Sequence, residues 1–195
     1  MWEQLVAARG GLPASTPSDL ERAELEAARF LAVEVADDGL LPLVARLSPA
    51  QVVAFLVLNQ IEAPGPAPNG TGASALLERL AAAGRDAYLL KAGRVGGGAE
   101  ERGSRSITES EVAAVLDGVV AGSIEWEEDP DFGYGVATVV PGLPPADGLL
   151  LPRMLYRRAD RVYEHAALVP KVKARRRASL DALEGLAPEI ARAAG

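Results

Sequence analysis

The feature that most constrains the fold is a stretch punctuated by proline and glycine, residues 129–144, which reads DPDFGYGVATVVPGLP. Asp129, Pro130 and Gly133 are typical of a tight turn, because an Asp side chain bonds nearby backbone N–H groups while proline and glycine suit turn dihedral angles. The apolar and β-branched residues at 134–140 favour a strand. Pro141 and Gly142 end it, since proline cannot donate to a strand ladder. The stretch therefore predicts a turn, a short strand and a rigid exit.

Two capping boxes predict where helices begin. Ser48 is followed three residues later by Gln51, and Thr108 by Glu111. In such a box the hydroxyl accepts from the backbone N–H three residues on, while the longer side chain bonds back to the N–H of the capping residue. We expect helices over residues 48–59 and 108–121, and Gly122 is a typical stop.

The remaining pattern alternates helices and strands. Further helices are expected at 16–29, at 73–83 before Gly84, and at 157–194 with interruptions at Pro170 and Pro188. Strands are expected at 30–35 and 87–90. This predicts an α/β (mixed α+β) protein with a single compact domain at 30–156, an N-terminal helical extension at 1–29 and a helical tail at 157–195.

Composition narrows the function classes. The chain has 195 residues, a net charge of −7, no cysteine and one histidine, His165. An acidic surface repels nucleic-acid phosphates and anionic lipids, so neither is an expected partner. Without cysteine there are no disulfides and no thiolate chemistry. The first residues do not resemble a signal peptide, and the apolar run at 52–58 is too short to cross a bilayer. We expect a cytoplasmic protein.

Four segments, in order along the chain, carry a pattern beyond secondary structure. They are residues 39–51 (GLLPLVARLSPAQ), 88–97 (YLLKAGRVGG), 129–144, and Pro152-Arg153 followed by Tyr156. Together they resemble segments of the ATP-dependent phosphoenolpyruvate carboxykinases, in the same order and with deletions, over about residues 30–163. The resemblance implies part of that family's C-terminal lobe as the fold.

The departures from the family concern its charged residues. Members hold ATP phosphates with a Gly-rich P-loop, and no Gly-x-x-x-x-Gly-Lys-Ser/Thr occurs in this sequence. The family's substrate-binding Arg would fall within residues 59–69, which contain no Arg. Its metal-binding Asp would fall within 34–38, where an insertion blurs the correspondence. We therefore assign no catalytic and no metal-binding residue.

The family's nucleotide-base loop falls on residues 102–107, where its Lys-Arg pair is replaced by Gly103 and Ser104. The resemblance implies that Arg105, Ser106 and Ile107 would line an adenine pocket if nucleotide still binds. ATP and Mg²⁺ would then be the cofactors.

The retained residues mostly build the fold, whereas the missing ones handle phosphate, metal and carboxylate. Losing one transition-state charge contact typically costs on the order of 10²–10³ in rate. Our hypothesis is a non-catalytic carboxykinase-like protein with a binding, regulatory or structural role, acting with a protein partner or as a homo-oligomer. The alternatives are a subunit of a split ATP-dependent carboxykinase, which would convert oxaloacetate and ATP to phosphoenolpyruvate in gluconeogenesis, or a stand-alone nucleotide sensor.

Other polar features have a functional and a structural interpretation, and we favour the structural one for most. The glycine-rich segment 93–103 is a phosphate cradle or a mobile connecting loop. Acids at 34–38 are a Mg²⁺ site or a solvated turn. The acids at 125–131 around Trp126 are interpreted either as a site for a cation or basic partner or as a solvated surface turn. His165 is expected at a surface helical position. The cations of 171–177 lie on a helix and could bind an acidic patch.

Overall fold

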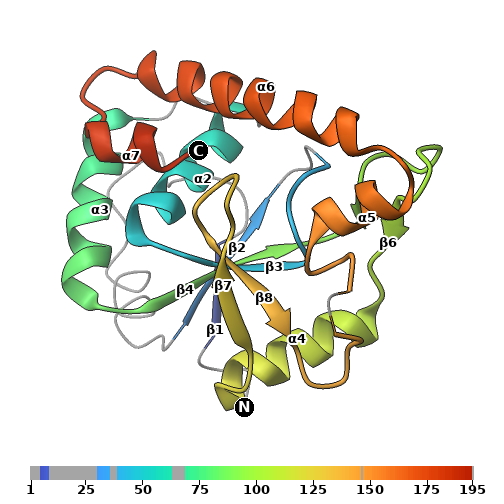
Figure 1. Cartoon of the computed structure of the whole chain (residues 1–195). Helices are drawn as coiled ribbons and strands as arrows, with labels where there is room; N and C mark the ends of the chain where they lie inside the picture. The colour runs from blue at the N-terminus through green and yellow to red at the C-terminus, as the bar shows by residue number, and fades with distance from the viewer. Residues whose placement is uncertain (1–4, 9–29, 36–38, 63–68, 146, 195) are drawn as a thin grey trace. The chain divides into compact units, whose positions relative to one another are not determined.

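The computed structural model describes residues 5–8, 30–35, 39–62, 69–145 and 147–194. Contacts divide the chain into two units, each built from separate segments. Unit 1 contains residues 1–35, 47–89 and 173–195, and unit 2 contains residues 36–46 and 90–172. The helix predicted at 16–29 lies outside the described residues. Figure 1 gives the order of the elements along the chain.

Unit 1 contains a parallel strand pair. Strand β1 (Leu5–Ala8) pairs with β2 (Phe30–Val35), with Leu5 opposite Phe30. The first residues of β4 (Asp86–Lys91) continue the strand order after β2. The prediction for 30–35 is confirmed, β4 extends the predicted strand at both ends, and β1 was not predicted.

Among its described residues, unit 1 contains the helices α2 (Pro49–Glu62), α3 (Gly70–Ala83) and α7 (Pro188–Ala193), together with the end of α6 (Val162–Asp181). The first capping box is confirmed, because Gln51 N–H lies 3.3 Å from Ser48 Oγ, and Ser48 N–H donates to Gln51 Oε1 over 2.9 Å. Val52, Val53 and Val57 of α2 are fully buried. The valines that follow the capping box thus form the buried part of α2.

Helix α3 begins earlier than predicted, at Gly70, because Asn69 caps it through Gly72 N–H at 3.2 Å. A Cβ at Gly70 would collide with the backbone of residues 184–186. That close approach is the reason for glycine here. Gly84 ends the helix with φ of 59°, as predicted.

Unit 2 contains an antiparallel sheet. Strand β8 (Gly135–Val139) lies between β3 (Val44–Leu47) and β7 (Glu125–Glu128), and the end of β4 lies beyond β3. Lys91 N–H, in β4, donates to Leu43 C=O over 3.0 Å. Strands β5 (Arg94–Val95) and β6 (Arg105–Ser106) form a separate antiparallel ladder.

The helices of unit 2 are α4 (Glu109–Ala121), α5 (Pro152–Arg158) and the first half of α6. The second capping box is confirmed at Thr108 and Glu111, and Gly122 ends α4 with φ of 65°. Both units combine helices with strands, which pair in parallel in unit 1 and antiparallel in unit 2, so the mixed α+β class is confirmed.

The turn at 129–134 forms as predicted. The carboxylate of Asp129 accepts from Asp131 N–H and Phe132 N–H, each at 2.9 Å, and Asp129 N–H donates to Tyr134 C=O over 2.8 Å. The following strand is confirmed as β8. The acidic segment before the turn was expected to be a surface turn, which is wrong: its residues pair with β8 as strand β7. Arg46 lies 5.9 Å from the ring centre of Trp126 in that strand.

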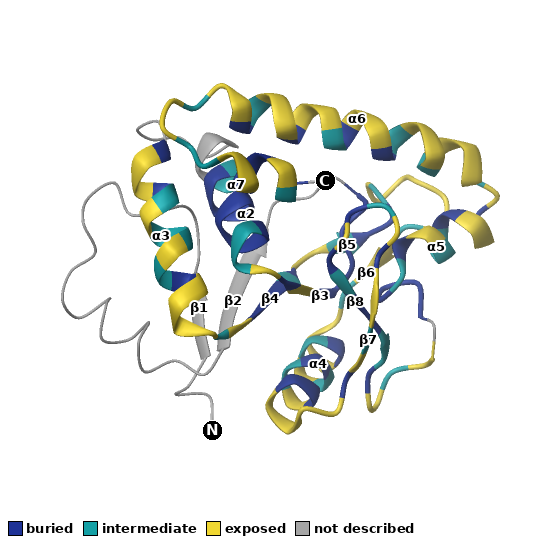
Figure 2. Ribbon diagram, turned by 60° about the vertical axis from the view of Figure 1, so that its left-hand side comes forward, coloured by how far each residue is buried: buried dark blue, intermediate teal, exposed yellow. Residues whose placement is uncertain are grey.

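The helical tail is interrupted at other places than predicted, because its helices break at residues 159–161 and 182–187. Pro188 begins α7, but Pro170 lies inside α6 without ending it. Pro170 is exposed, whereas the adjacent Val169 and the nearby Val172 are buried. Figure 2 shows that exposed residues run along one side of α6. The burial of these apolar side chains offsets the backbone hydrogen bond that proline removes.

Candidate binding site around Arg105

The three residues expected to line an adenine pocket lie together at and after strand β6. Arg105 and Ser106 form the strand, with Arg94 of β5 opposite Ser106. Ile107 N–H donates to Gly93 C=O over 2.8 Å. Helix α4 then begins at Glu109, so the ladder and the capping box hold this short segment at both ends.

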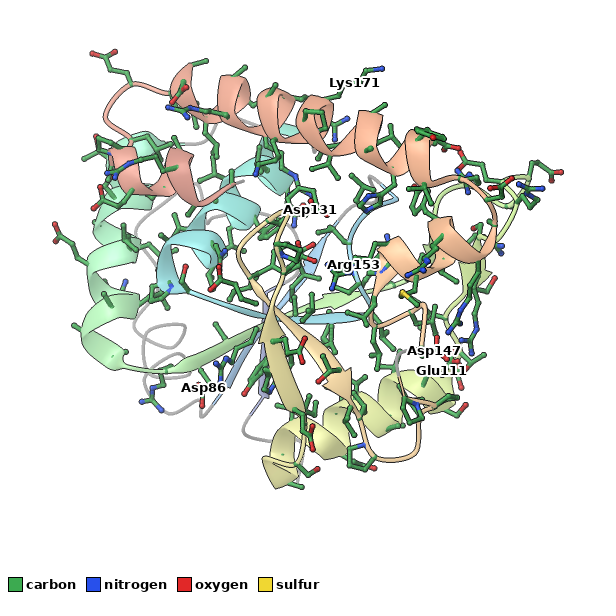
Figure 3. All side chains as sticks on the ribbon, viewed as in Figure 1. Asp86, Glu111, Asp131, Asp147, Arg153 and Lys171 are labelled. Atoms are coloured by element: carbon green, nitrogen blue, oxygen red, sulfur yellow. The ribbon has the colours of Figure 1, made fainter. Side chains whose placement is uncertain are left out.

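Arg105 is bound to two carboxylates of its own chain. Its Nη1 lies 2.6 and 2.7 Å from the two oxygens of Asp147, and its Nη2 pairs with Glu111. The Arg105 side chain is 43% exposed, whereas those of Asp147 and Glu111 are 9% and 10% exposed. The hydrogen bond to Asp147 raises the pKa of Arg105, against the opposing effect of burial. Figure 3 shows Glu111 and Asp147 close together near the start of α4.

Both carboxylates also bind backbone. Glu111 Oε2 accepts from Thr108 N–H at 2.8 Å, which completes the capping box of α4. Asp147 Oδ1 accepts from Leu149 N–H at 2.8 Å. The cluster of Arg105, Glu111 and Asp147, called the Arg105 cluster below, thus joins β6, the start of α4 and the segment before α5.

Ser106 is bonded by a second arginine, Arg94. The Arg94 guanidinium donates to Ser106 Oγ, and its Nε donates to Ser104 Oγ over 3.0 Å. Ser104 Oγ in turn donates to Gly97 C=O over 2.7 Å. Sequence reasoning did not single out Arg94 or Asp147 for this site. Glu111 carried a signal, as part of the capping box, whereas no local pattern marked Asp147.

A second ionic cluster ties the glycine-rich segment to the start of α6. Arg161 Nη1 donates to the carbonyls of Gly96, at 3.0 Å, and Arg102, at 2.8 Å. Its Nη2 pairs with Glu101 and Glu164. Hydrogen bonding to Glu164 is the main cause that raises the pKa of Arg161, and the same bond lowers the pKa of Glu164. The interpretation of 93–103 as a connecting loop was incomplete, because β5 lies within it and Arg161 holds it.

Tyr156 extends this Arg161 cluster toward the only histidine. The Arg161 guanidinium lies 4.6 Å from the centre of the Tyr156 ring, and His165 packs edge-on to the same ring at 5.2 Å. His165 Nε2 is 4.0 Å from an Asp131 carboxylate oxygen. Burial lowers the pKa of His165, although Asp131 and Asp129 act in the opposite direction. The expectation of a surface position was only partly right, since the His165 side chain is 16% exposed and packs against Tyr156.

The acids once considered for Mg²⁺ at 34–38 have no described side chains. Elsewhere in the described parts of the chain, His, Asp and Glu do not gather in threes at metal-binding spacing. Every helix among the described residues is too short or too polar to cross a lipid bilayer.

A comparison with models of known protein families gives no match, and a comparison with curated proteins gives none either.

Proposed function

We propose that this chain is a non-catalytic phosphoenolpyruvate carboxykinase-like protein whose role is binding, regulatory or structural. The observation that carries the proposal is the state of Arg105, one of two arginines in the segment 102–107 that resembles the family's nucleotide-base loop and the one expected to line an adenine pocket. Its guanidinium is engaged by Asp147 and Glu111, both nearly buried. A guanidinium held this way serves the fold, and a ligand that recruited it would leave two carboxylates without their counter-charge.

The lack of a P-loop motif in the sequence supports the same proposal independently of Arg105. A P-loop is missing from all 195 residues, so phosphate has no backbone cradle and no lysine of that type. The loss of several transition-state contacts multiplies, because each typically contributes on the order of 10²–10³ in rate.

The direct test is an activity assay with the purified full chain, oxaloacetate, ATP and Mg²⁺, with an active carboxykinase as the positive control. We expect no formation of phosphoenolpyruvate above the rate without protein. Turnover by this chain alone would overturn the proposal.

Calorimetric titration with ATP and Mg²⁺ separates the alternatives. No heat up to millimolar ligand is the expected result and excludes the nucleotide sensor. Saturable binding without turnover would favour the sensor. Turnover that requires a second, co-purifying polypeptide would favour a split enzyme.

A further inference from the structure

The outer face of α6 carries the most exposed large apolar side chain among the described residues. Tyr163 is 93% exposed, and the neighbouring Val162 is 52% exposed. Pro170, two turns further on, is exposed as well. An aromatic ring left fully in water costs free energy that burial in an interface would recover. This face is therefore a candidate interaction surface, and its neighbouring charges indicate what it would bind.

The spacing of this face is that of a helix that packs on another helix. Its exposed residues recur at intervals of three or four, so at about 3.6 residues per turn they lie on one side of α6. They are Tyr163, Ala167, Pro170, Ala174 and Ala178. The buried residues lie on the opposite side: Val169, Val172, Arg176 and Leu180.

Charged residues lie along one flank of this face, with an acid near the start of the helix and two cations further along. Glu164, whose carboxylate also pairs with Arg161 of its own chain, lies near the start of the helix. Lys171 and Arg175 follow along the same flank, and all three residues are exposed. In a parallel pair about a two-fold axis, the charged flanks of the two helices would lie on opposite sides of the contact and would not meet. An antiparallel copy would place Glu164 between Lys171 and Arg175 of the second copy, and the reverse, because a two-fold axis sets the same flank of each helix against its equivalent.

We propose that α6 pairs with α6 of a second copy of this chain, antiparallel and about a two-fold axis between Ala167 and Pro170. In this pairing Tyr163 packs on Ala174 of the second copy, a large side chain against a small one. Ala167 packs on Pro170 of the second copy. The contact is self-complementary in both shape and charge, which favours a second copy over an acidic partner of another kind.

One helix pair supplies less area than a standard interface of about 1,200–2,000 Å². We therefore expect a reversible dimer with a dissociation constant on the order of 100 μM. Sedimentation equilibrium of the full chain from about 10 μM to about 1 mM measures it. A chain that stays monomeric throughout this range overturns the proposal.

The first variant is Tyr163→Ser, with Val120→Ser as its matched control. Val120 is another exposed apolar residue, 43% exposed on α4. We expect Tyr163→Ser to raise the dissociation constant about tenfold, as for truncation of an aromatic anchor, and Val120→Ser to leave it unchanged. Circular dichroism checks that both remain folded. Equal effects of the two substitutions would contradict the assigned face.

The second experiment is a charge exchange. Glu164→Lys alone, or Lys171→Glu with Arg175→Glu, sets like charges against each other in each homodimer and should weaken it. A mixture of the two variants restores opposite charges on both flanks, so a heterodimer should form at least as tightly as the wild-type dimer. If mixing restores nothing, the antiparallel arrangement is wrong. Capture of an acidic protein without self-association would assign the face to another partner.

Discussion

The two ionic clusters of unit 2 are built from the same groups in opposite arrangements. Arg105 is 43% exposed and its two carboxylates are nearly buried, whereas Arg161 is 11% exposed and its two carboxylates are about half exposed. A buried charge that loses its partner costs far more than an exposed one, since water cannot replace the lost contact. The vulnerable groups are therefore the acids in the first cluster and the arginine in the second.

The backbone contacts differ in the same way. In the Arg105 cluster it is the carboxylates that accept backbone N–H groups, at Thr108 and Leu149. In the Arg161 cluster it is the arginine that donates to backbone carbonyls, at Gly96 and Arg102. Each cluster thus anchors the chain through its buried member, and the exposed member balances its charge.

The largest effect should come from Arg105→Gln. This change leaves Glu111 and Asp147 nearly buried without a counter-charge, and we expect a loss of about 2–3 kcal/mol in the free energy of unfolding near pH 7. That is below the full cost of a broken buried pair, because Arg105 itself is half exposed. Urea denaturation followed by circular dichroism measures the loss.

The matched control for Arg105→Gln is Arg177→Gln, which removes an exposed pair with Asp181 at 3.4 Å. It should change stability by less than about 0.5 kcal/mol. Equal losses for the two variants would break the comparison between the clusters.

Arg161→Met should cost less, about 1–2 kcal/mol, because its carboxylates stay hydrated while two backbone carbonyls lose their donor and Tyr156 loses its cation contact. The same denaturation experiment measures it. This loss should persist in acid, since the carbonyls do not titrate. A loss that disappears on acidification would mean that the carboxylates dominate this cluster too.

His165, which packs on Tyr156 beside the Arg161 cluster, should make the free energy of unfolding depend on pH. Burial lowers its pKa in the folded state below the ordinary value of about 6.5, so the unfolded chain binds a proton first as pH falls. Stability should therefore decrease as pH falls below about 6.5 and level off once pH passes the folded pKa.

Titration of the single imidazole by NMR measures the folded pKa of His165. Denaturation at several pH values compares the wild type with His165→Gln, in which this part of the pH dependence should vanish. A folded pKa above that of an unfolded peptide would show that Asp131 and Asp129 outweigh burial, and would reverse the sign.

The smallest effect should come from Glu101→Gln. Arg161 then keeps Glu164 and both carbonyls, and the lost partner was about half exposed. We expect a change within about 0.5 kcal/mol, measured as above. A loss as large as that of Arg161→Met would mean that Glu101 holds the glycine-rich segment by itself.

Local signals in the sequence predicted much of the secondary structure. The capping boxes at Ser48 and Thr108, the stop at Gly122 and the turn at Asp129 form as expected, because each depends on residues within a few positions of one another. Strands β1, β3, β5, β6 and β7 were missed. Segment β7 is rich in Glu, which strands disfavour, and it is a strand because β8 lies beside it.

The candidate site was predicted only in part, because its contacts join residues that are distant in sequence. Arg105, Ser106 and Ile107 were expected from a resemblance of sequence, which says nothing of their partners. Asp147 lies 42 positions after Arg105 and approaches it only through the fold. Arg161 lies 65 positions after Gly96 and is likewise joined to it by the fold alone.

The sequence by itself determined where α2 and α4 start, where α3 and α4 stop and where the chain turns at Asp129, because capping and turn formation are energies of neighbouring residues. It also determined the acidic balance and the lack of cysteine. Only the tertiary structure decided that Pro170 stays within a helix, that the acids before Asp129 form a strand and that Arg105 is held by Asp147. Those outcomes depend on packing and charge pairing between segments distant in sequence, which no local pattern encodes.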